Sequence, residues 1–245
     1  MYKVILIIGF LLASVVGVTT ASAEILNDAG KATYVSGEVY VIRDSERLAL
    51  SEGDSVFASD TVVTASSGRV TLLMHDDSKI YVGRSSRLSL SDYAVKEKTL
   101  ISGAFNLLWG KVRFFVAKLS DNSSFNVSTR TAVLGVRGTE FVVIVPVPEG
   151  MPDLTGIEPP VNLPELITTV FGIEGLVEGF SSTGKRMLIG PGVKVEFTND
   201  GTIKFTTQDK PISIPTVKPG SAPPPEIPDV PKPSDIIVPS GQFLY

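Results

Sequence analysis

The sequence predicts an all-β fold, and three observations carry that prediction. Short stretches alternate between apolar and polar residues with a period of two, which places one set of side chains inward and the other outward. Gly, Ser, Asp and Asn residues, which favour turns, separate these stretches. No window of about 12 residues or more shows the apolar stripe of a capped helix. The alternating stretches are residues 70–74, 88–90, 125–127, 193–197 and 203–205.

Two further stretches, residues 112–116 and 141–145, are almost continuously apolar. A strand without polar alternates is typical of one that is covered on both faces. Strands that follow one another at intervals of about 8–12 residues are typical of a sandwich, a barrel or a solenoid. The pattern alone leaves these three architectures open.

The first residues have the composition of a secretory signal peptide. Lys3 carries a positive charge, residues 4–18 are apolar, and Ala21-Ser22-Ala23 supplies small residues for cleavage before Glu24. The apolar run is shorter than the ~20 residues that span a bilayer comfortably. We therefore predict a cleaved signal peptide at 1–23, no membrane span after cleavage, and a periplasmic or extracellular location. An uncleaved anchor is the alternative, and residues 24–33 are expected to form a linker.

Proline is concentrated in two segments. Residues 146–165 predict a long loop inserted between strands, and residues 209–245 predict an extended, disordered tail, because proline cannot donate to a β-ladder. The tail is interpreted either as a spacer or as a strap that docks on a partner or on the cell wall. Its aromatic end, Phe243 to Tyr245, is similar to the C-terminus of outer-membrane barrels, but no run of membrane-length strands precedes it.

Composition excludes several function classes. The net charge is −4, the isoelectric point is about 5.2, and no basic run occurs, so nucleic acid is not an expected partner. Cysteine is absent, which removes disulfides, thiolate metal sites and Cys nucleophiles. There is one histidine, His75, and it stands beside Asp76 and Asp77 in a predicted turn, where adjacent residues do not form an oriented catalytic base. We expect no enzyme activity, no cofactor and no metal, and we interpret these turn residues as solvated.

The run Val136-Arg137-Gly138-Thr139-Glu140-Phe141 resembles the signature of the FecR domain family. The preceding strand and turn at 125–135 fit the same pattern, as do the segments 35–39, 53–56, 60–64, 75–78, 110–113, 173–177 and 189–192. The resemblance spans about residues 34–205, and we expect one FecR-like domain at 34–208. It implies a β-rich, solenoid-like winding or twisted β-sandwich.

The resemblance also carries functional expectations. FecR proteins of the iron-citrate type resemble inner-membrane anti-sigma regulators whose cytoplasmic segment and membrane helix precede this domain. Here only the predicted signal peptide precedes it, so we expect a stand-alone exported form. In the signature, Arg137 and Glu140 are predicted to form a buried ion pair that pins the turn, so that Arg137→Ala destabilises the domain. A contact of these residues with a ligand or partner is the alternative.

The function expected from this reasoning is a non-enzymatic, extracytoplasmic binding module that acts through protein–protein contacts in envelope signalling or assembly. Its partners would be envelope proteins. The alternative is a structural envelope protein that binds carbohydrate or peptidoglycan. Trp109, the single tryptophan, fits the core and an interface equally well at this stage.

Overall fold

The computed structural model describes residues 28–147, 156 and 167–207, and this part of the chain is all-β, as predicted. It contains 17 strands and no helix, so no helix in it could cross a bilayer. The predicted signal peptide, most of the proline-rich loop at 146–165 and the tail at 209–245 lie outside the described residues.

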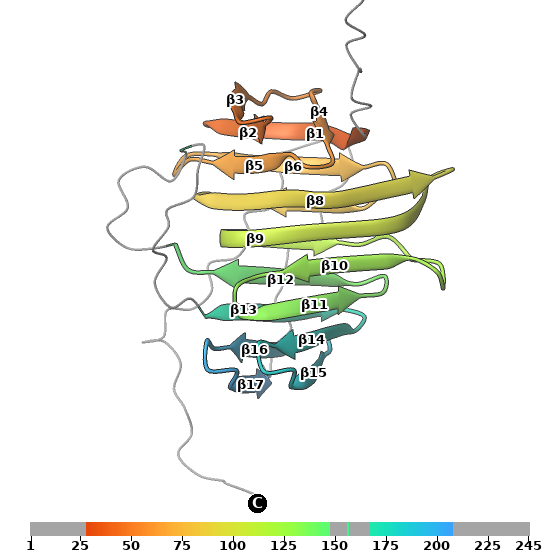
Figure 1. Cartoon of the computed structure of the whole chain (residues 1–245), viewed down its shortest axis with the longest axis vertical. Coiled ribbons are helices and arrows are strands. Elements are labelled where there is room, and N and C mark those ends of the chain that lie inside the picture. The colour runs from red at the N-terminus through yellow and green to blue at the C-terminus, as the bar shows by residue number, and fades with distance from the viewer. Residues whose placement is uncertain (1–27, 148–155, 157–166, 208–245) are drawn as a thin grey trace, which may run out of the picture.

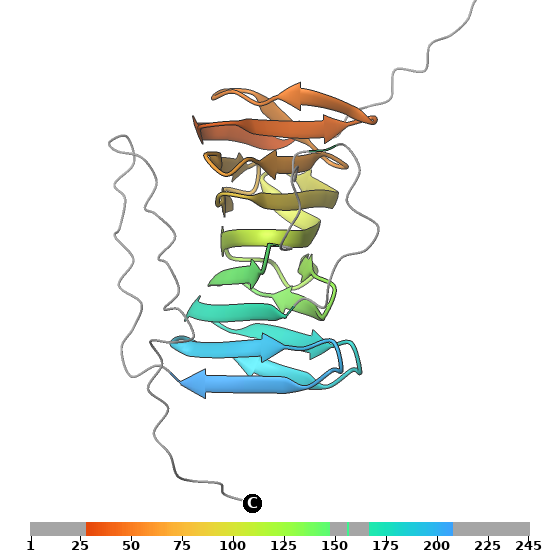
Figure 2. The ribbon, with the colours of Figure 1, turned by 90° about the vertical axis from the view of Figure 1, so that its left-hand side faces the viewer.

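The strands form two sheets that face each other across a common core (Figures 1 and 2). Sheet A contains, in spatial order, β4 (Ser55–Phe57), β1 (Asp28–Ser36), β6 (Arg69–Met74), β7 (Lys79–Val82), the second part of β9 (Thr99–Phe115), β12 (Glu140–Val145), β13 (Thr168–Glu174), β16 (Val193–Phe197) and β17 (Ile203–Thr207). Sheet B contains β3 (Glu46–Ala49), β2 (Val39–Arg43), β5 (Thr61–Thr64), β8 (Ser86–Lys96), the first part of β9, β10 (Ser124–Ser128), β11 (Ala132–Val136), β14 (Val177–Ser181) and β15 (Arg186–Ile189).

The chain passes repeatedly between the two sheets as it progresses from one end of the stack to the other. After β5 in sheet B it forms β6 and β7 in sheet A, and after β11 in sheet B it forms β12 and β13 in sheet A. Figure 2 shows the resulting column of strands, with β1 to β4 near one end and β15 to β17 near the other. The sheets do not close on themselves. This confirms the solenoid-like, twisted sandwich and excludes the barrel for the described residues.

One strand, β9, belongs to both sheets. Its first part pairs with β8 and β10 in sheet B, and its second part pairs with β7 and β12 in sheet A. The strand changes sheet at Gly110, whose φ of +104° is a conformation that residues with a Cβ rarely adopt. The β9–β10 pair is parallel, and every other recorded pair is antiparallel. The consequence is that β9 joins the two sheets covalently in the middle of the stack.

Aromatic rings fill the core beside β9. The ring centroids of Phe105 and Phe125 lie 4.9 Å apart, and those of Phe114 and Phe141 lie 5.1 Å apart, both pairs stacked. Trp109 is 1% exposed, so of the two predicted roles the core is the one it occupies. These large rings hold the sheets together, because offset aromatic pairs add stabilisation beyond the area they bury.

Two details of the sequence prediction are corrected. The sheet begins at Asp28, so residues 28–33, expected in the linker, form most of β1. They were missed because Ala and Gly have low strand propensity, yet Ala29 and Ala32 are buried where the sheets approach closely. In addition, Phe115 is 41% exposed, so the stretch 112–116 is covered on one face only.

Candidate functional site

The FecR-like signature forms a strand, a turn and the start of the next strand. Val136 ends β11 in sheet B, Arg137 to Thr139 make the turn, and Glu140 and Phe141 open β12 in sheet A. Phe141 is fully buried, and Thr139 is 3% exposed. Gly138 has a φ of +61°, and a Cβ there would lie 3.2 Å from the Cα of Lys118. The signature therefore carries the chain from one sheet to the other through a turn that requires glycine.

The predicted ion pair between Arg137 and Glu140 is wrong. Glu140 accepts hydrogen bonds from Nε, at 2.6 Å, and from Nη2 of Arg113 on the adjacent strand β9. The side chains of this pair are only 12% and 13% exposed. Arg113 lies 5.5 Å from the centroid of the Tyr81 ring, and burial raises the pKa of Tyr81 above its usual value. Antiparallel pairing of β12 with β9 explains why Glu140 pairs with Arg113, because it brings these two residues onto the same face of the sheet.

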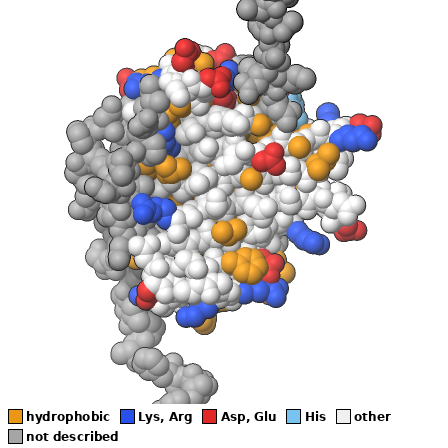
Figure 3. All heavy atoms as spheres, in the orientation of Figure 1, with side chains coloured by type: hydrophobic (Ala, Val, Ile, Leu, Met, Phe, Trp, Pro, Cys, Tyr) orange, Lys and Arg blue, Asp and Glu red, His pale blue; other side chains and the backbone are white. Residues whose placement is uncertain are grey.

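Arg137 is instead exposed, and its side chain lies at the rim of a groove on the outer face of sheet B. The groove has a volume of about 560 Å³ and crosses β10, β11, β14 and β15. Its lining is formed by Ser123, Ser124, Phe125, Asn126, Gly135, Val136, Arg137, Gly175, Leu176, Glu178 and Leu188. Figure 3 looks onto this sheet and shows apolar and charged side chains together over its lower part.

The register of four strands explains the hollow. Asn126, Gly135, Glu178 and Leu188 are directly opposite one another across β10, β11, β14 and β15. Gly135 has no side chain, and the nearest atoms that a Cβ there would meet, Asn126 Oδ1 and the Glu178 carbonyl oxygen, are both 3.9 Å away. At Gly135, the row therefore has no side chain between the polar side chains of Asn126 and Glu178. The backbone of Gly135 forms the floor of the groove.

The chemistry of the lining is that of a binding surface. Leu176 and Leu188 are 58% and 51% exposed, so they offer apolar area that the fold itself does not cover. Arg137 supplies a cation that can form paired hydrogen bonds to a carboxylate. The Ser124 hydroxyl and the Asn126 amide add hydrogen-bonding groups. Among the described residues no cluster of three His, Cys, Asp or Glu side chains could hold a metal ion.

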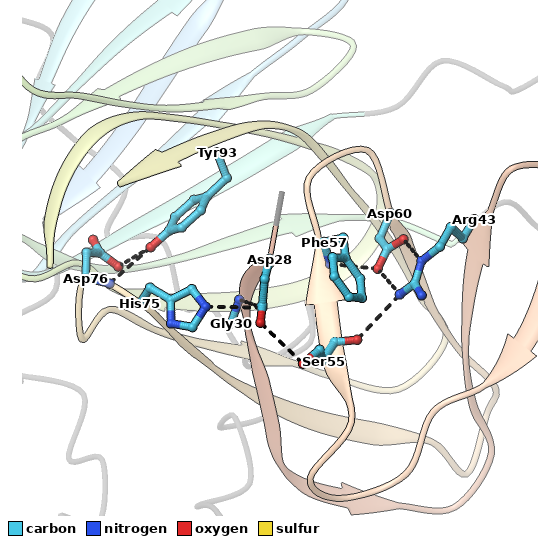
Figure 4. Close-up of polar contacts among 9 residues, drawn as sticks. All are labelled: Asp28, Gly30, Arg43, Ser55, Phe57, Asp60, His75, Asp76 and Tyr93. Carbon is cyan, nitrogen blue, oxygen red and sulfur yellow. Dashed lines mark hydrogen bonds and ion pairs between the residues drawn. The ribbon is translucent and has the colours of Figure 1, made fainter. Parts of the chain in front are cut away.

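The turn at His75, Asp76 and Asp77 is not solvated throughout, contrary to the prediction. Asp76 is 5% exposed and accepts a hydrogen bond of 2.6 Å from the Tyr93 hydroxyl (Figure 4). It accepts another of 2.7 Å from the Ser78 hydroxyl. Burial, and next the hydrogen bond to Asp76, raise the pKa of Tyr93 far above its usual range. His75 is half exposed, and its Nε2 lies 3.1 Å from Asp28 Oδ1. This turn joins β6 to β7, and its hydrogen bond with Tyr93 ties it to β8.

A second buried carboxylate is Asp60, which opens the segment 60–64 of the FecR-like pattern and whose burial was not predicted. It is completely buried, and both its oxygens accept hydrogen bonds of 2.8 Å from Arg43, whose guanidinium lies 4.2 Å from the centroid of the Phe57 ring (Figure 4). The pKa of Arg43 is raised, first by its hydrogen bond to Asp60. Asp60 also accepts a bond from the Phe57 amide at 2.8 Å. These contacts make Asp60 a structural centre near β4 and β5.

The groove itself was also missed, although its rim residue Arg137 was named. Leu188 sits in a strand where Arg186 and Leu188 face outward while Ile189 is buried. An apolar residue in an outward position of a strand was the available signal. It could be recognised only after the inward set was known.

Comparison with known proteins locates the FecR-like region. The family model described as FecR protein matches residues 60–150, which confirms the resemblance for the segment that contains β5 to β12 and the signature. No curated protein matches the chain.

Two crystal structures of a candidate anti-sigma factor from Parabacteroides distasonis ATCC 8503, at 1.65 Å and 2.50 Å resolution, are similar to this chain. Each has a TM-score of 0.46 and 15% sequence identity. Each alignment covers 61% of this chain and 60% of that chain, which is less than two thirds of the anti-sigma protein.

Proposed function

Starting from the FecR match at residues 60–150, we propose that this chain is a non-enzymatic, extracytoplasmic binding module of envelope signalling or assembly. It acts by holding a segment of another envelope protein in the groove on sheet B. The signal-peptide pattern of residues 1–23 supports export. The match to a family described as FecR protein supports a role in signalling.

The observation that carries the proposal is the row that passes through Gly135. A missing side chain between Asn126 and Glu178 leaves a hollow about one side chain wide, with Leu188 exposed at the far side. An extended peptide presents alternate side chains toward the surface on which it lies, so one of them can enter such a hollow. The rest of the peptide would cross the exposed Leu176 and Leu188, whose burial supplies the apolar part of the affinity.

Arg137 supports a preference for partners that carry an acidic residue. It is exposed at the groove rim, whereas the neighbouring Glu178 is already paired with Arg186. A carboxylate on the partner would gain a charge-assisted hydrogen bond from the guanidinium. The signature arginine thus has a binding role in this proposal, in place of the structural role predicted from the sequence.

The test uses a photo-crosslinking amino acid placed at Leu188 in the full-length protein in living cells of the source bacterium. The matched control carries the same amino acid at Thr33, an exposed position of β1 in sheet A. We expect one envelope protein to be captured reproducibly from position 188 and not from position 33. Mass spectrometry of the product identifies it.

A groove-filling variant, Gly135→Val, makes the test specific. The added side chain has room and suits a strand, so the melting temperature should stay within a few degrees of the wild type while capture from position 188 falls at least about tenfold. Ser91→Val, at an exposed position of β8, is the control and should leave capture unchanged. Undiminished capture by Gly135→Val would refute the groove as the contact site.

Carbohydrate or peptidoglycan binding is the rival function, and the same crosslinking experiment tests it. Recovery of cell-wall glycan in place of a protein from position 188 would favour that rival.

A further inference from the structure

The stack of strands ends abruptly beyond β17 and β15. Phe205 of β17 is directly opposite Val195, and Val195 is fully buried, so both side chains face the space between the sheets. Phe205 is nevertheless 66% exposed, because no described strand lies beyond it. At this end the core is therefore not covered by a further strand of the described part of the chain, and the ring of Phe205 is exposed there.

The opposite end has the same character. All four residues of β3 are exposed, and Leu48 is directly opposite Val41, which is 3% exposed and belongs to the core. Leu48 therefore also faces the space between the sheets, and it is 39% exposed. Both ends thus combine an apolar core residue with a strand edge that has no neighbour among the described strands.

The two ends differ in charge. Around β3 and β4 the exposed charged residues are Asp44, Glu46, Arg47, Glu52 and Asp54, so acidic groups predominate. Between residues 182 and 207 the exposed charged residues are Lys185, Arg186, Asp200 and Lys204. Arg186 is paired with Glu178, and the remaining residues still leave basic groups in excess. In Figure 3 acidic side chains gather near the upper end, and Lys and Arg side chains near the lower end.

In sheet B, strand direction and length are also compatible across the two ends. Within sheet B every step from β3 to β15 is antiparallel except β9–β10, and the odd number of reversals makes β3 and β15 run in opposite directions. Each of the two strands has four residues. If one molecule is stacked on another in the same orientation, β15 of the first meets β3 of the second as an antiparallel pair.

We propose that the occupant of each end is a second copy of this chain, joined head to tail. The basic end of one molecule, with Phe205, meets the acidic end of the next, with Leu48, so that the core and sheet B continue across the junction. Because the two joined surfaces differ, each molecule keeps one free end, and the association is open rather than closed at a dimer.

The experiment measures the mass of the full exported chain by analytical ultracentrifugation from micromolar to millimolar concentration. The weight-average mass should rise beyond that of a dimer as concentration increases, and added salt should reduce it, because opposite charges attract across the junction. A mass that stays at the monomer, or that stops at the dimer, would overturn the proposal.

Two variants and their mixture identify the surfaces. Phe205→Asp blocks the basic end, because it sets an acidic group against the acidic end of the next molecule, and Leu48→Lys blocks the acidic end, because it sets a basic group against the basic end. Both positions are exposed enough that the isolated fold should tolerate the change. Each variant alone should remain monomeric, whereas an equimolar mixture should form a 1:1 dimer through the two intact ends. Val133→Asp is the control, because Val133 is 48% exposed on sheet B, and this variant should associate like the wild type.

Circular dichroism of every variant shows whether its sheet is intact, so that loss of folding is distinguished from loss of association. A mixture of folded variants that remains monomeric contradicts the head-to-tail junction. The groove in sheet B is unchanged in these variants, so their effect is independent of the binding function proposed above.

Discussion

Arg113 in β9 and Arg137 in the turn before β12 carry the same charge, but their surroundings differ. Arg113 is bound to Glu140 and nearly covered, whereas Arg137 lies at the rim of the groove. The sequence placed Arg137 beside Glu140 because they are three residues apart. The sheet instead brings Glu140 to a residue 27 positions away. Pairing across strands, rather than proximity along the chain, decides which arginine is structural.

This difference gives opposite expectations for two alanine substitutions. Arg113→Ala should lower the free energy of unfolding by about 1–3 kcal/mol, because it leaves the Glu140 carboxylate largely covered and unpaired. Arg137→Ala should change it by less than about 0.5 kcal/mol, as is usual for exposed positions. Urea unfolding of both variants checks this, and equal losses would contradict the assignment.

Tyr93 is the second residue whose surroundings determine a measurable property. It is 1% exposed, and its hydroxyl donates to Asp76. Burial, followed by that bond, raises the pKa of the folded form far above the unfolded value of about 10. The stabilisation linked to this shift is therefore fully present below pH about 10 and is lost as pH rises further, when the unfolded tyrosine ionises.

Tyr93→Phe should consequently be less stable than the wild type by about 1–3 kcal/mol at neutral pH, because Asp76 loses a buried hydrogen-bond donor. Above pH about 10 the free energy of unfolding of the wild type should fall more steeply than that of the variant, so the difference between them narrows. Tyr81, whose pKa is also raised, is present in both proteins and does not affect the comparison. If the free energies of unfolding of the wild type and of Tyr93→Phe changed in parallel from about pH 8 to about pH 11, the role of Tyr93 would be contradicted.

At the scale of elements, β9 determines the architecture because it is shared by both sheets. Its change of sheet depends on Gly110, where a Cβ would lie 2.1 Å from Ser86 Oγ and 2.4 Å from Ser86 Cα. Ser86 Oγ is held in place, since it accepts a bond of 3.1 Å from the Lys111 amide and donates one of 3.0 Å to the Arg84 carbonyl. Strand β8 therefore has little freedom to move away from β9.

Gly110→Ala should destabilise the protein by about 2–4 kcal/mol, from the positive φ together with the contact against backbone. Gly135→Ala is the matched control: its Cβ has 3.9 Å of clearance, and the loss of glycine freedom in the unfolded chain should stabilise it by about 0.4–1 kcal/mol. Thermal unfolding of the two variants makes the comparison. A tolerated alanine at 110 would mean that the bend does not depend on glycine.

At the scale of the whole molecule, the sequence predicted the all-β content and the alternating strands at 70–74, 88–90, 125–127, 193–197 and 203–205. Those features depend on local periodicity and on turn chemistry, which are written in consecutive residues. It did not predict which strands pair, the ladder of Asn126, Gly135 and Glu178, or the burial of Asp60 and Asp76. Each of these depends on partners from distant parts of the chain, so it becomes visible only when the sheets are assembled.

The column of strands also limits how far a change at either end can disturb the rest of the fold. Strands β1 to β4 and β13 to β17 lie outside the segment that the FecR model matches. Each strand is hydrogen-bonded only to its immediate neighbours in its sheet. A hairpin gained or lost at either end therefore disturbs no pairing near β9. The segment that the FecR model matches, residues 60–150, is thus the part of the column whose pairing depends on neither end.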